Sequence, residues 1–371
     1  MPIEISKPEI NVREQLNALR SPVSEAGSKV MQSDSTYDQV ALLGLQPNNV
    51  FINGDQRIWQ RGTTQTGIGA STEVVVSDRW RNYQSGTTGR CTWSQDTDAP
   101  DGHEYSAKLQ VTTADTSVGS NHRWNIAYRM EADDFAQFGF GTVYAVGFTI
   151  QFWVKTNKTG TYCIDAYKNG TAPTATRQFT IHQGGVWQQI VLTWPPSVYA
   201  ASGNPSFWIW LQAGSDYTDD RGTGWATATD GRAHGISVNL YDDTSNYFMI
   251  TGIQMTKGQV PSGLPFERRS YGEELALCQR YYYQTDSSSK YRFSMNVGAS
   301  TTAHYASWPH PVTMRDDPTV AITATTTDNW SSIGTSGDNS TIALGLAFNP
   351  NGTADTRCLA EFHFTANAEV S

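Results

Sequence analysis

The stretch that decides the fold is residues 148–155, Phe-Thr-Ile-Gln-Phe-Trp-Val-Lys, in which apolar and polar side chains alternate. Successive side chains of a β-strand point to opposite faces, so a strand here has one apolar face. That face carries Phe148, Ile150, Phe152 and Val154. Residues 157–160, Asn-Lys-Thr-Gly, follow and indicate a hairpin turn into another strand. The pattern predicts a strand that is buried on one face.

Short apolar or alternating stretches recur on both sides of this strand. They lie at residues 73–76, 106–111, 161–167, 187–194, 206–211 and 247–255. Short strands separated by turn residues favour a jelly-roll or another β-sandwich. We therefore predict a jelly-roll body over residues 46–262. Trp208 and Trp210 share one strand face, and we expect that face to belong to the core.

Residues 263–371 form a second, smaller predicted unit. Residues 273–283 have a helical pattern, with Leu275, Leu277 and Cys278 partly sharing a face. Short strands are expected at residues 291–297, 320–325, 341–348 and 358–365. The expected architecture is mainly all-β: a jelly-roll β-sandwich body and a smaller C-terminal β-domain, with short N-terminal and interdomain helices.

Residues 1–45 differ from the rest of the chain. A short helix is predicted there, with Val12, Leu16 and Leu19 on one face and Asn11 as its cap. A helix this short is only marginally stable on its own in water. We expect this segment to dock as an anchor or an oligomerisation element. It lacks the apolar stretch of a secretory signal, which predicts synthesis in the cytoplasm.

The composition argues against several functional classes. Of 371 residues, 16% are charged and 12% aromatic, and the net charge is −9. Nucleic acid is not an expected partner, because its phosphates require clustered Lys and Arg. No apolar run reaches the ~18 residues of a transmembrane helix, so membrane insertion is not expected. The four cysteines form no CxxC pair, and we predict buried free thiols.

Two segments resemble structural proteins of tailed-bacteriophage particles. Residues 53–62 (Asn-Gly-Asp-Gln-Arg-Ile-Trp-Gln-Arg-Gly), followed by Asp78-Arg79-Trp80, resemble the start of a domain common in such proteins, and residues 248–255 resemble its end. Residues 265–282 (Pro-Phe-Glu-Arg-Arg-Ser-Tyr-Gly-Glu-Glu-Leu-Ala-Leu-Cys-Gln-Arg-Tyr-Tyr) resemble the linker-helix before a C-terminal β-domain. That domain carries Met-Arg-Asp-Asp-Pro-Thr-Val at 314–320 and closes on 365–370. The resemblance implies a structural role in the virion, often as a symmetric oligomer.

The body also resembles a carbohydrate-binding-module jelly roll of the galactose-binding-like type. In those modules the first strand begins with an Asn-Gly pair, and in the second strand a Trp lies close to an Arg. Gly252-Ile253-Gln254 stands where they place an acidic residue, so their structural calcium is not carried over. The acidic loop at residues 96–102 echoes a calcium loop, but Ala107 replaces the closing Glu of an EF-hand. The presence of a metal is left open.

The candidate ligand site is a polar, glycine-rich loop at residues 217–225. A tryptophan is less naturally buried in such a loop, and aromatic faces can stack on sugar rings. The candidate ligand-binding residues are Trp225, Tyr217, Asp219, Asp220 and Arg221. The alternative is a loop tip that packs on a neighbouring subunit.

Enzymatic motifs are not found in the sequence. There is no Gly-x-Ser-x-Gly elbow, no His-Glu-x-x-His and no Walker loop, and no cofactor is predicted. Two adjacent acidic pairs, Asp219-Asp220 and Asp242-Asp243, are the candidates for glycan hydrolysis, although such pairs are usually solvated turns.

The predicted function is a non-enzymatic subunit of a tail fibre, tail tip or adhesin in the virion, contacting a host surface glycan. By family analogy we expect a homotrimer that meets other virion proteins through residues 1–45. One alternative is a purely architectural capsid decoration or head-fibre protein. The other is a glycan depolymerase.

Overall fold

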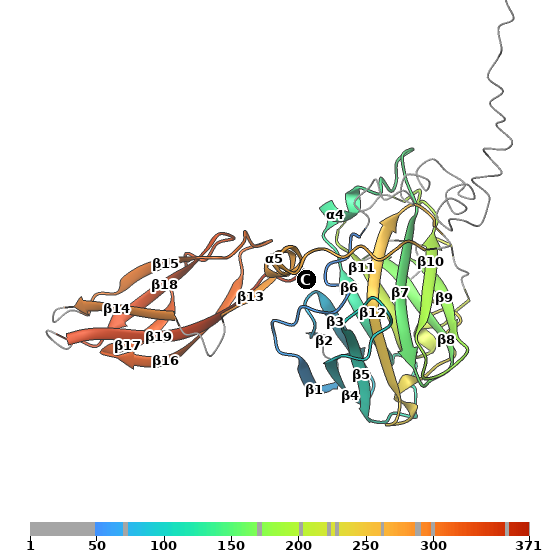
Figure 1. Cartoon of the computed structure of the whole chain (residues 1–371), viewed down its shortest axis with the longest axis horizontal. Coiled ribbons are helices and arrows are strands. Elements are labelled where there is room, and N and C mark those ends of the chain that lie inside the picture. The colour runs from blue at the N-terminus through green and yellow to red at the C-terminus, as the bar shows by residue number, and fades with distance from the viewer. Residues whose placement is uncertain are drawn as a thin grey trace, which may run out of the picture.

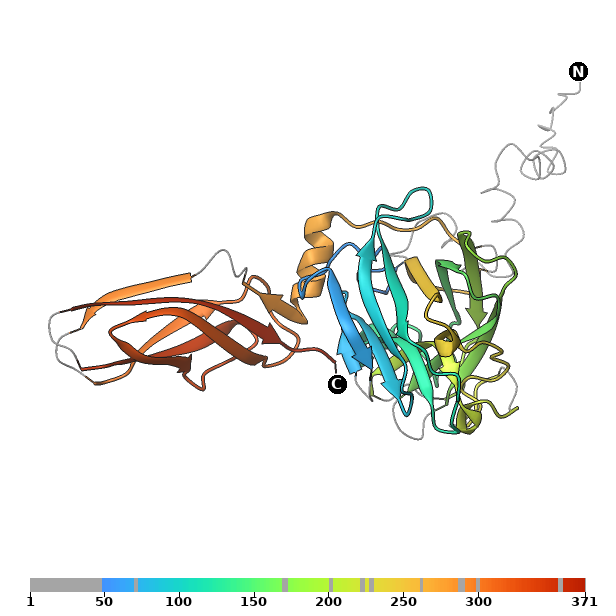
Figure 2. The same cartoon turned by 90° about the horizontal axis from the view of Figure 1, so that it is seen from below.

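The computed structural model describes residues 49–69, 73–168, 173–199, 203–220, 224–226, 230–260, 263–285, 291–297, 301–352 and 356–370. In these ranges the chain forms two β-structures with a helix between them (Figures 1 and 2). The all-β prediction with a jelly-roll body is confirmed. The predicted N-terminal helix and anchor lie outside the described residues. None of the described helices is long and apolar enough to cross a membrane.

The larger structure, which we call the body, consists of two six-stranded antiparallel sheets. Sheet A contains, in spatial order, β1 (Thr64–Gly69), β4 (Arg90–Asp96), β5 (Ser106–Thr113), β12 (Tyr247–Lys257), β7 (Phe148–Thr156) and β10 (Gln188–Trp194). Sheet B contains β2 (Glu73–Val75), β3 (Trp80–Ser85), β6 (Arg123–Arg129), β11 (Pro205–Ala213), β8 (Gly160–Lys168) and β9 (Ala175–Ile181). The two sheets face each other across the main core (Figure 1).

The alternation in β7 places its apolar face in the main core, as predicted. Phe148, Ile150, Phe152 and Val154 are all 0% exposed. Burying each such side chain contributes about 1.5–3 kcal/mol. The four cysteines are free thiols and buried, which confirms that prediction as well.

Trp208 and Trp210 are buried, but they do not face the main core. Phe207 and Ile209 of the same strand do. The two tryptophans lie on the outer face of sheet B in a separate cluster, packed with Tyr217, Ala233 and Ile236 from the chain that follows β11. Alternation shows only that the two faces of a strand differ, and a long loop buries the second face here.

The smaller structure, which we call the cap, is a sandwich of two sheets. The first contains β13 (Tyr282–Gln284), β19 (Thr356–Asn367) and β14 (Tyr291–Val297), with β16 (Thr319–Asp328) also paired to β19. The second contains β15 (His304–Pro309), β18 (Ala343–Pro350) and β17 (Trp330–Thr335). The helical turns of the described chain are α4 (Ala132–Ala136), η1 (Ser215–Tyr217), η2 (Leu240–Asp242) and α5 (Tyr271–Gln279). The predicted interdomain helix is α5, which ends earlier than expected because the chain turns into β13.

The body and the cap meet beside α5, where the C-terminus lies (Figure 2). This joint is built around the buried carboxylate of Glu369. Three arginines of the body surround it: Arg79 at 2.5 Å, Arg61 at 3.2 Å and Arg81 at 3.4 Å. The guanidinium of Arg79 also lies 3.5 Å from the ring centroid of Tyr281. Burial alone would raise the pKa of Glu369, but the three arginines outweigh it and hold the pKa below its ordinary value.

Helix α5 fastens the joint to the start of the body. Ser270 and Glu273 form a capping box at its N-terminus, which satisfies two backbone donors. Glu274, in the same turn, is 4% exposed and accepts the backbone N–H of Asn53 at 2.5 Å. It also lies 3.2 Å from the guanidinium of Arg269. The helix therefore holds residues far apart in the chain in one buried polar network.

We predict that Glu369→Gln destabilises the docking of the cap on the body. The substitution removes the charge that compensates three arginines, and breaking a buried ion pair costs about 3–5 kcal/mol. Denaturant unfolding and limited proteolysis between body and cap would measure the loss. Asp316→Asn is the control, because Asp316 is 66% exposed and its contacts are local: an ion pair with Arg315 and a hydrogen bond from the backbone of Asp317. Equal stability of the two variants would contradict the role given to Glu369.

A second prediction concerns Asp78, which lies beside this network. Burial raises the pKa of Asp78 to about 7, although Arg61, 3.0 Å away, opposes the shift. The folded state therefore holds a proton that the unfolded state releases near pH 4, so this contribution to stability is lost as pH rises through 7. We expect the stability of the protein relative to Asp78→Asn to fall from about pH 4 to pH 7 and to level off above pH 7. Parallel pH profiles of the free energy of unfolding would refute this.

Candidate functional site

Trp153 stands on the outer face of sheet A, opposite the core. Its neighbours in β7, Phe152 and Val154, point inward, so alternation turns the indole outward. Across the sheet it is paired with Gln189 on β10 and Thr251 on β12. Trp153 is half-buried, which leaves part of the ring accessible on a rigid strand.

A bulge in β12 shapes the surface beside Trp153. The register of β12 shifts between Thr251 and Gln254, and Gly252 lies in the bulge with a φ of +62°. A Cβ on Gly252 would lie 2.7 Å from Cε1 of His103 and 3.1 Å from Cδ1 of Trp153. Glycine is needed here both for the backbone conformation and for the close approach of the two rings.

Two loops close over this bulge and are tied to each other. The ring of His103 packs edge-on against Phe266, with centroids 5.0 Å apart. Arg268 donates to the carbonyl of Gly102 at 2.6 Å. Burial, with a smaller contribution from the charge of Arg268, lowers the pKa of His103 to about 4. The imidazole is therefore neutral at pH 7, where it can both donate and accept a hydrogen bond.

These residues enclose a cavity of about 320 Å³. Its aromatic side is formed by Trp153, His103 and Phe266, and Gln189 and Asp101 supply exposed polar groups. Such a volume is at the low end of the ~300–1,000 Å³ of small-molecule sites, which combine apolar walls with a few polar groups. We call this cavity the sheet A pocket.

A second tryptophan, Trp187, contacts the acidic loop that forms one wall of the pocket. It immediately precedes β10, is half-buried, and donates its indole N–H to Asp98 at 2.9 Å. Asp98 also pairs with Lys155 at 2.5 Å. The hydrogen bond from Lys155, followed by that from Trp187, lowers the pKa of Asp98. These contacts hold the acidic loop against the outer face of sheet A.

The acidic loop at residues 96–102 has a sequence that echoes a calcium loop. Its Asp98 is engaged by Lys155 and Trp187, and Asp101 lines the pocket. Within the described ranges, no group of three or more His, Cys, Asp or Glu side chains is arranged to hold a metal ion. In the structure the loop forms one wall of the sheet A pocket.

The predicted ligand residues Trp225 and Tyr217 are held by internal contacts. Trp225 packs edge-on against Phe140 at 5.2 Å and donates its indole N–H to the carbonyl of Pro195 at 2.9 Å. Tyr217 packs against Trp210, with centroids 5.2 Å apart, on the outer face of sheet B. The two rings serve different clusters, and neither lines the sheet A pocket.

The acidic residues of the same loop are exposed. Asp219 and Asp220 both lie at the surface, and Asp220 is 3.5 Å from Nε2 of His234. Arg221 lies outside the described residues. Of the four predicted residues that the structure describes, Trp225 and Tyr217 pack in different clusters and Asp219 and Asp220 are exposed. The ligand role of the five residues stays a prediction.

Sequence reasoning missed Trp153, although a signal was available. The alternation that assigns Phe152 and Val154 to the core places Trp153 on the opposite face beside polar neighbours. A tryptophan on the polar face of an amphipathic strand is a candidate contact residue. Residues 264–268 could not be assigned to the same pocket, because their approach to the sheet is a long-range contact.

Comparisons with known proteins concern the fold. No protein-family model matches the chain, and no curated protein matches it. Similar solved structures include the enzymatically active domain of tailspike protein 4 from bacteriophage CBA120, at 12% identity and a TM-score of 0.29. That match covers 48% of this chain and only 19% of the tailspike chain.

Two further similar structures are carbohydrate-binding modules. One is a CBM4 module, at 12% identity and a TM-score of 0.30, covering 55% of this chain and 97% of the module. The other is the family 11 module of a cellulosomal cellulase from Clostridium thermocellum, at 11% identity and a TM-score of 0.27, covering 51% of this chain and 96% of the module. The sheet topology of this chain itself defines an all-β jelly-roll protein, and its body has an aromatic pocket on an outer sheet face.

We predict that Gly252→Ala disrupts the sheet A pocket. The new Cβ would collide with His103 and Trp153 at a positive φ, and such strain costs about 1–3 kcal/mol. Denaturant unfolding and tryptophan fluorescence would report the loss of stability and the displaced rings. Gly272→Ala is the control, since a Cβ on Gly272 meets nothing within 4 Å in the first turn of α5. A Gly252→Ala variant as stable as the parent would contradict this reading.

Proposed function

We propose that the chain binds a glycan through the sheet A pocket, as a non-enzymatic module of a surface appendage. The observation that carries the proposal is the outward, half-buried Trp153 set between ordered polar groups. A rigid indole offers a broad apolar face at little entropic cost, which suits the C–H face of a sugar ring.

The polar groups of the pocket suit the hydroxyls of the same ligand. Gln189 and Asp101 are exposed beside Trp153, and neutral His103 adds a further hydrogen-bonding group. Gln151 forms a fixed floor, because its amide bonds the backbone of Leu264 in both directions, at 2.6 and 2.7 Å. A ligand would therefore meet groups that are already positioned, which lowers the entropic cost of binding.

The pocket favours binding over hydrolysis as the proposed activity. Glycoside hydrolysis commonly uses two carboxylates about 5–9.5 Å apart. Among the described residues that line the pocket, Asp101 is the one carboxylate. The adjacent Asp242 and Asp243 lie elsewhere: Asp242 pairs with Lys158, and Asp243 accepts the backbone N–H of Ser245 at 2.7 Å.

We further propose that this appendage belongs to a tailed-phage particle. The support is the resemblance of residues 53–62 and 265–282 to virion proteins, together with the position of both segments at the joint. A projecting cap on a jelly-roll body suits a fibre or tail-tip subunit (Figure 2). We also propose that the chain forms a homotrimer, which is anchored to other virion proteins through residues 1–45.

Glycan-array binding tests the ligand part of the proposal. We expect the full chain to bind a subset of bacterial surface glycans, and Trp153→Ala to weaken this binding about tenfold or more, as truncating a central aromatic contact does. Tyr144→Ala is the control, because Tyr144 is 82% exposed and lies outside the pocket. The proposal would be wrong if the parent chain bound no glycan, or if Trp153→Ala and Tyr144→Ala bound equally well.

Antibody labelling of intact particles tests the location, and light scattering tests the oligomer. We expect label at the tail and a mass of three chains. Label at the head would instead favour the decoration protein, and a monomer in solution would remove the trimer from the proposal.

A further inference from the structure

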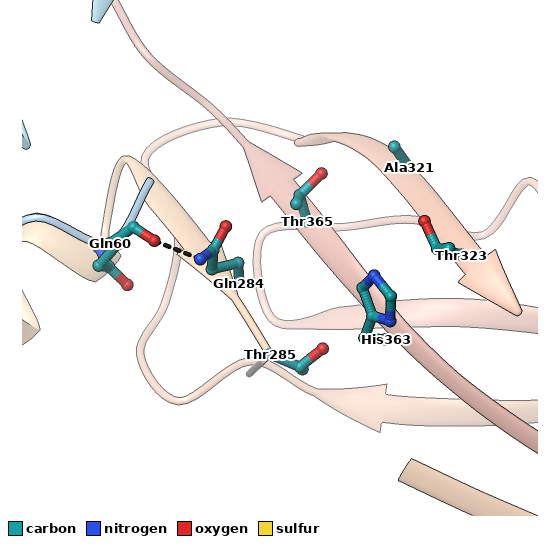
Figure 3. Close-up of a pocket in the computed structure, with 7 residues that line it drawn as sticks. All are labelled: Gln60, Gln284, Thr285, Ala321, Thr323, His363 and Thr365. Atoms are coloured by element: carbon teal, nitrogen blue, oxygen red, sulfur yellow. Dashed lines mark hydrogen bonds between the residues drawn. The ribbon is translucent and has the colours of Figure 1, made fainter. Parts of the chain in front are cut away.

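A second cleft lies where the cap meets the body (Figure 3). It has a volume of about 390 Å³ and is separate in its lining from the sheet A pocket. The body contributes Gln60, and the cap contributes Gln284, Thr285, Ala321, Thr323, His363 and Thr365. We call it the joint cleft.

Strand alternation in the cap builds the floor of the joint cleft. Phe362 and Phe364 of β19 point into the cap core, so His363 and Thr365 point outward. Register pairs Thr365 with Ala321 of β16 and His363 with Thr323, which sets two rows side by side. The small side chain of Ala321 leaves the floor hollow between larger neighbours (Figure 3).

The wall of the cleft joins the two domains. Gln60 donates its side-chain amide to the carbonyl of Tyr282 at 2.7 Å. In return, Gln284 donates to the backbone carbonyl of Gln60, the dashed bond in Figure 3. The next residue, Arg61, lies 3.6 Å above the ring of Tyr282 and pairs with Glu369. The wall is therefore held in place by the buried network of the joint.

Several groups on the floor remain available to a ligand. In the part of the chain that the structure describes, the hydroxyls of Thr323 and Thr365 and Nε2 of His363 have no hydrogen-bond partner in the protein, whereas Nδ1 of His363 is unpartnered but buried. The hydroxyl of Thr285 is already engaged, since it accepts the N–H of Phe364 at 2.8 Å. Two free hydroxyls and an imidazole thus face one hollow on a rigid sheet (Figure 3).

The chemistry of these groups selects the ligand. Hydroxyls and amides donate and accept hydrogen bonds, and an imidazole offers two ring nitrogens for hydrogen bonding. No described lining residue is an Asp, Glu, Lys or Arg, so a charged ligand would find no counter-ion there. Sugar hydroxyls also donate and accept hydrogen bonds, so each polar group of the cleft can pair with one hydroxyl of a sugar.

We propose that the joint cleft is a second ligand site, which takes a neutral, hydroxyl-rich ligand of about one sugar ring. It is independent of the glycan site proposed on sheet A, because the two share no described lining residue. Since Gln60 and the cap strands contact the same ligand, occupancy stabilises the docked arrangement of body and cap.

The test uses the full chain and three probes: glucose, galactose and N-acetylglucosamine. Calorimetric titration should detect binding of at least one probe, and Thr323→Val with Thr365→Val should weaken it about tenfold, the expected effect of losing two hydrogen bonds. Thr327→Val is the matched control on the same strand, because Thr327 is exposed and lies outside the cleft. Trp153→Ala should leave this binding intact.

The ring resonances of His363 in the unsubstituted chain provide a readout that does not depend on any variant folding. They should shift on titration with the bound sugar. If no probe shifts them, or if Trp153→Ala alone abolishes all sugar binding, the joint cleft is not a sugar site. If the double threonine variant still binds glycan and Trp153→Ala does not, the result supports the sheet A proposal and overturns the joint cleft as a second site.

Discussion

The rest of the structure depends on the burial of one carboxylate, Glu369, among three guanidinium groups. Removing a carboxylate from water is unfavourable unless opposite charges and hydrogen bonds replace the lost hydration. The arginines come from the first part of the body, whereas Glu369 lies close to the C-terminus. The last segment of the chain can therefore be buried only against a folded body, and the two domains acquire a defined contact.

The segments that resemble phage virion proteins converge on this joint. Residues 53–62 supply the backbone N–H that Glu274 accepts, Arg79 and Arg61 bind Glu369, and residues 265–282 contain α5. A buried charge network restricts side-chain identity more tightly than apolar packing, which tolerates swaps of similar volume. The recognisable segments thus describe how a cap is attached to a body. Most residues that line the two proposed ligand sites lie outside these segments, in loops and on outer sheet faces, where sequence change is generally better tolerated.

Both proposed ligand sites are built from segments that the joint positions. Phe266 and Arg268 reach the sheet A pocket just before α5 begins, and Gln60 reaches the joint cleft just before Arg61 enters the charge network. Loosening the joint should therefore affect both sites. A binding surface placed beside a rigid contact keeps its groups in position at little entropic cost.

Sequence alone determined the class of fold, because alternation is a local property of the chain. The alternation at residues 148–155 placed four side chains in the core correctly, and the helical pattern near residue 275 located α5. The same reasoning did not find β13, β15 or β17 in the cap, whose strands are short and half-exposed. It expected Trp208 and Trp210 on a core face, and both are buried, but in a separate cluster on the outer face of sheet B. No local pattern shows which distant residues cover that face. Only the tertiary structure decided which side chains meet: Trp153 with His103 and Phe266, Gln60 with Gln284, and Glu369 with its arginines. Those contacts join residues far apart in the chain, and no local pattern encodes the distance between them.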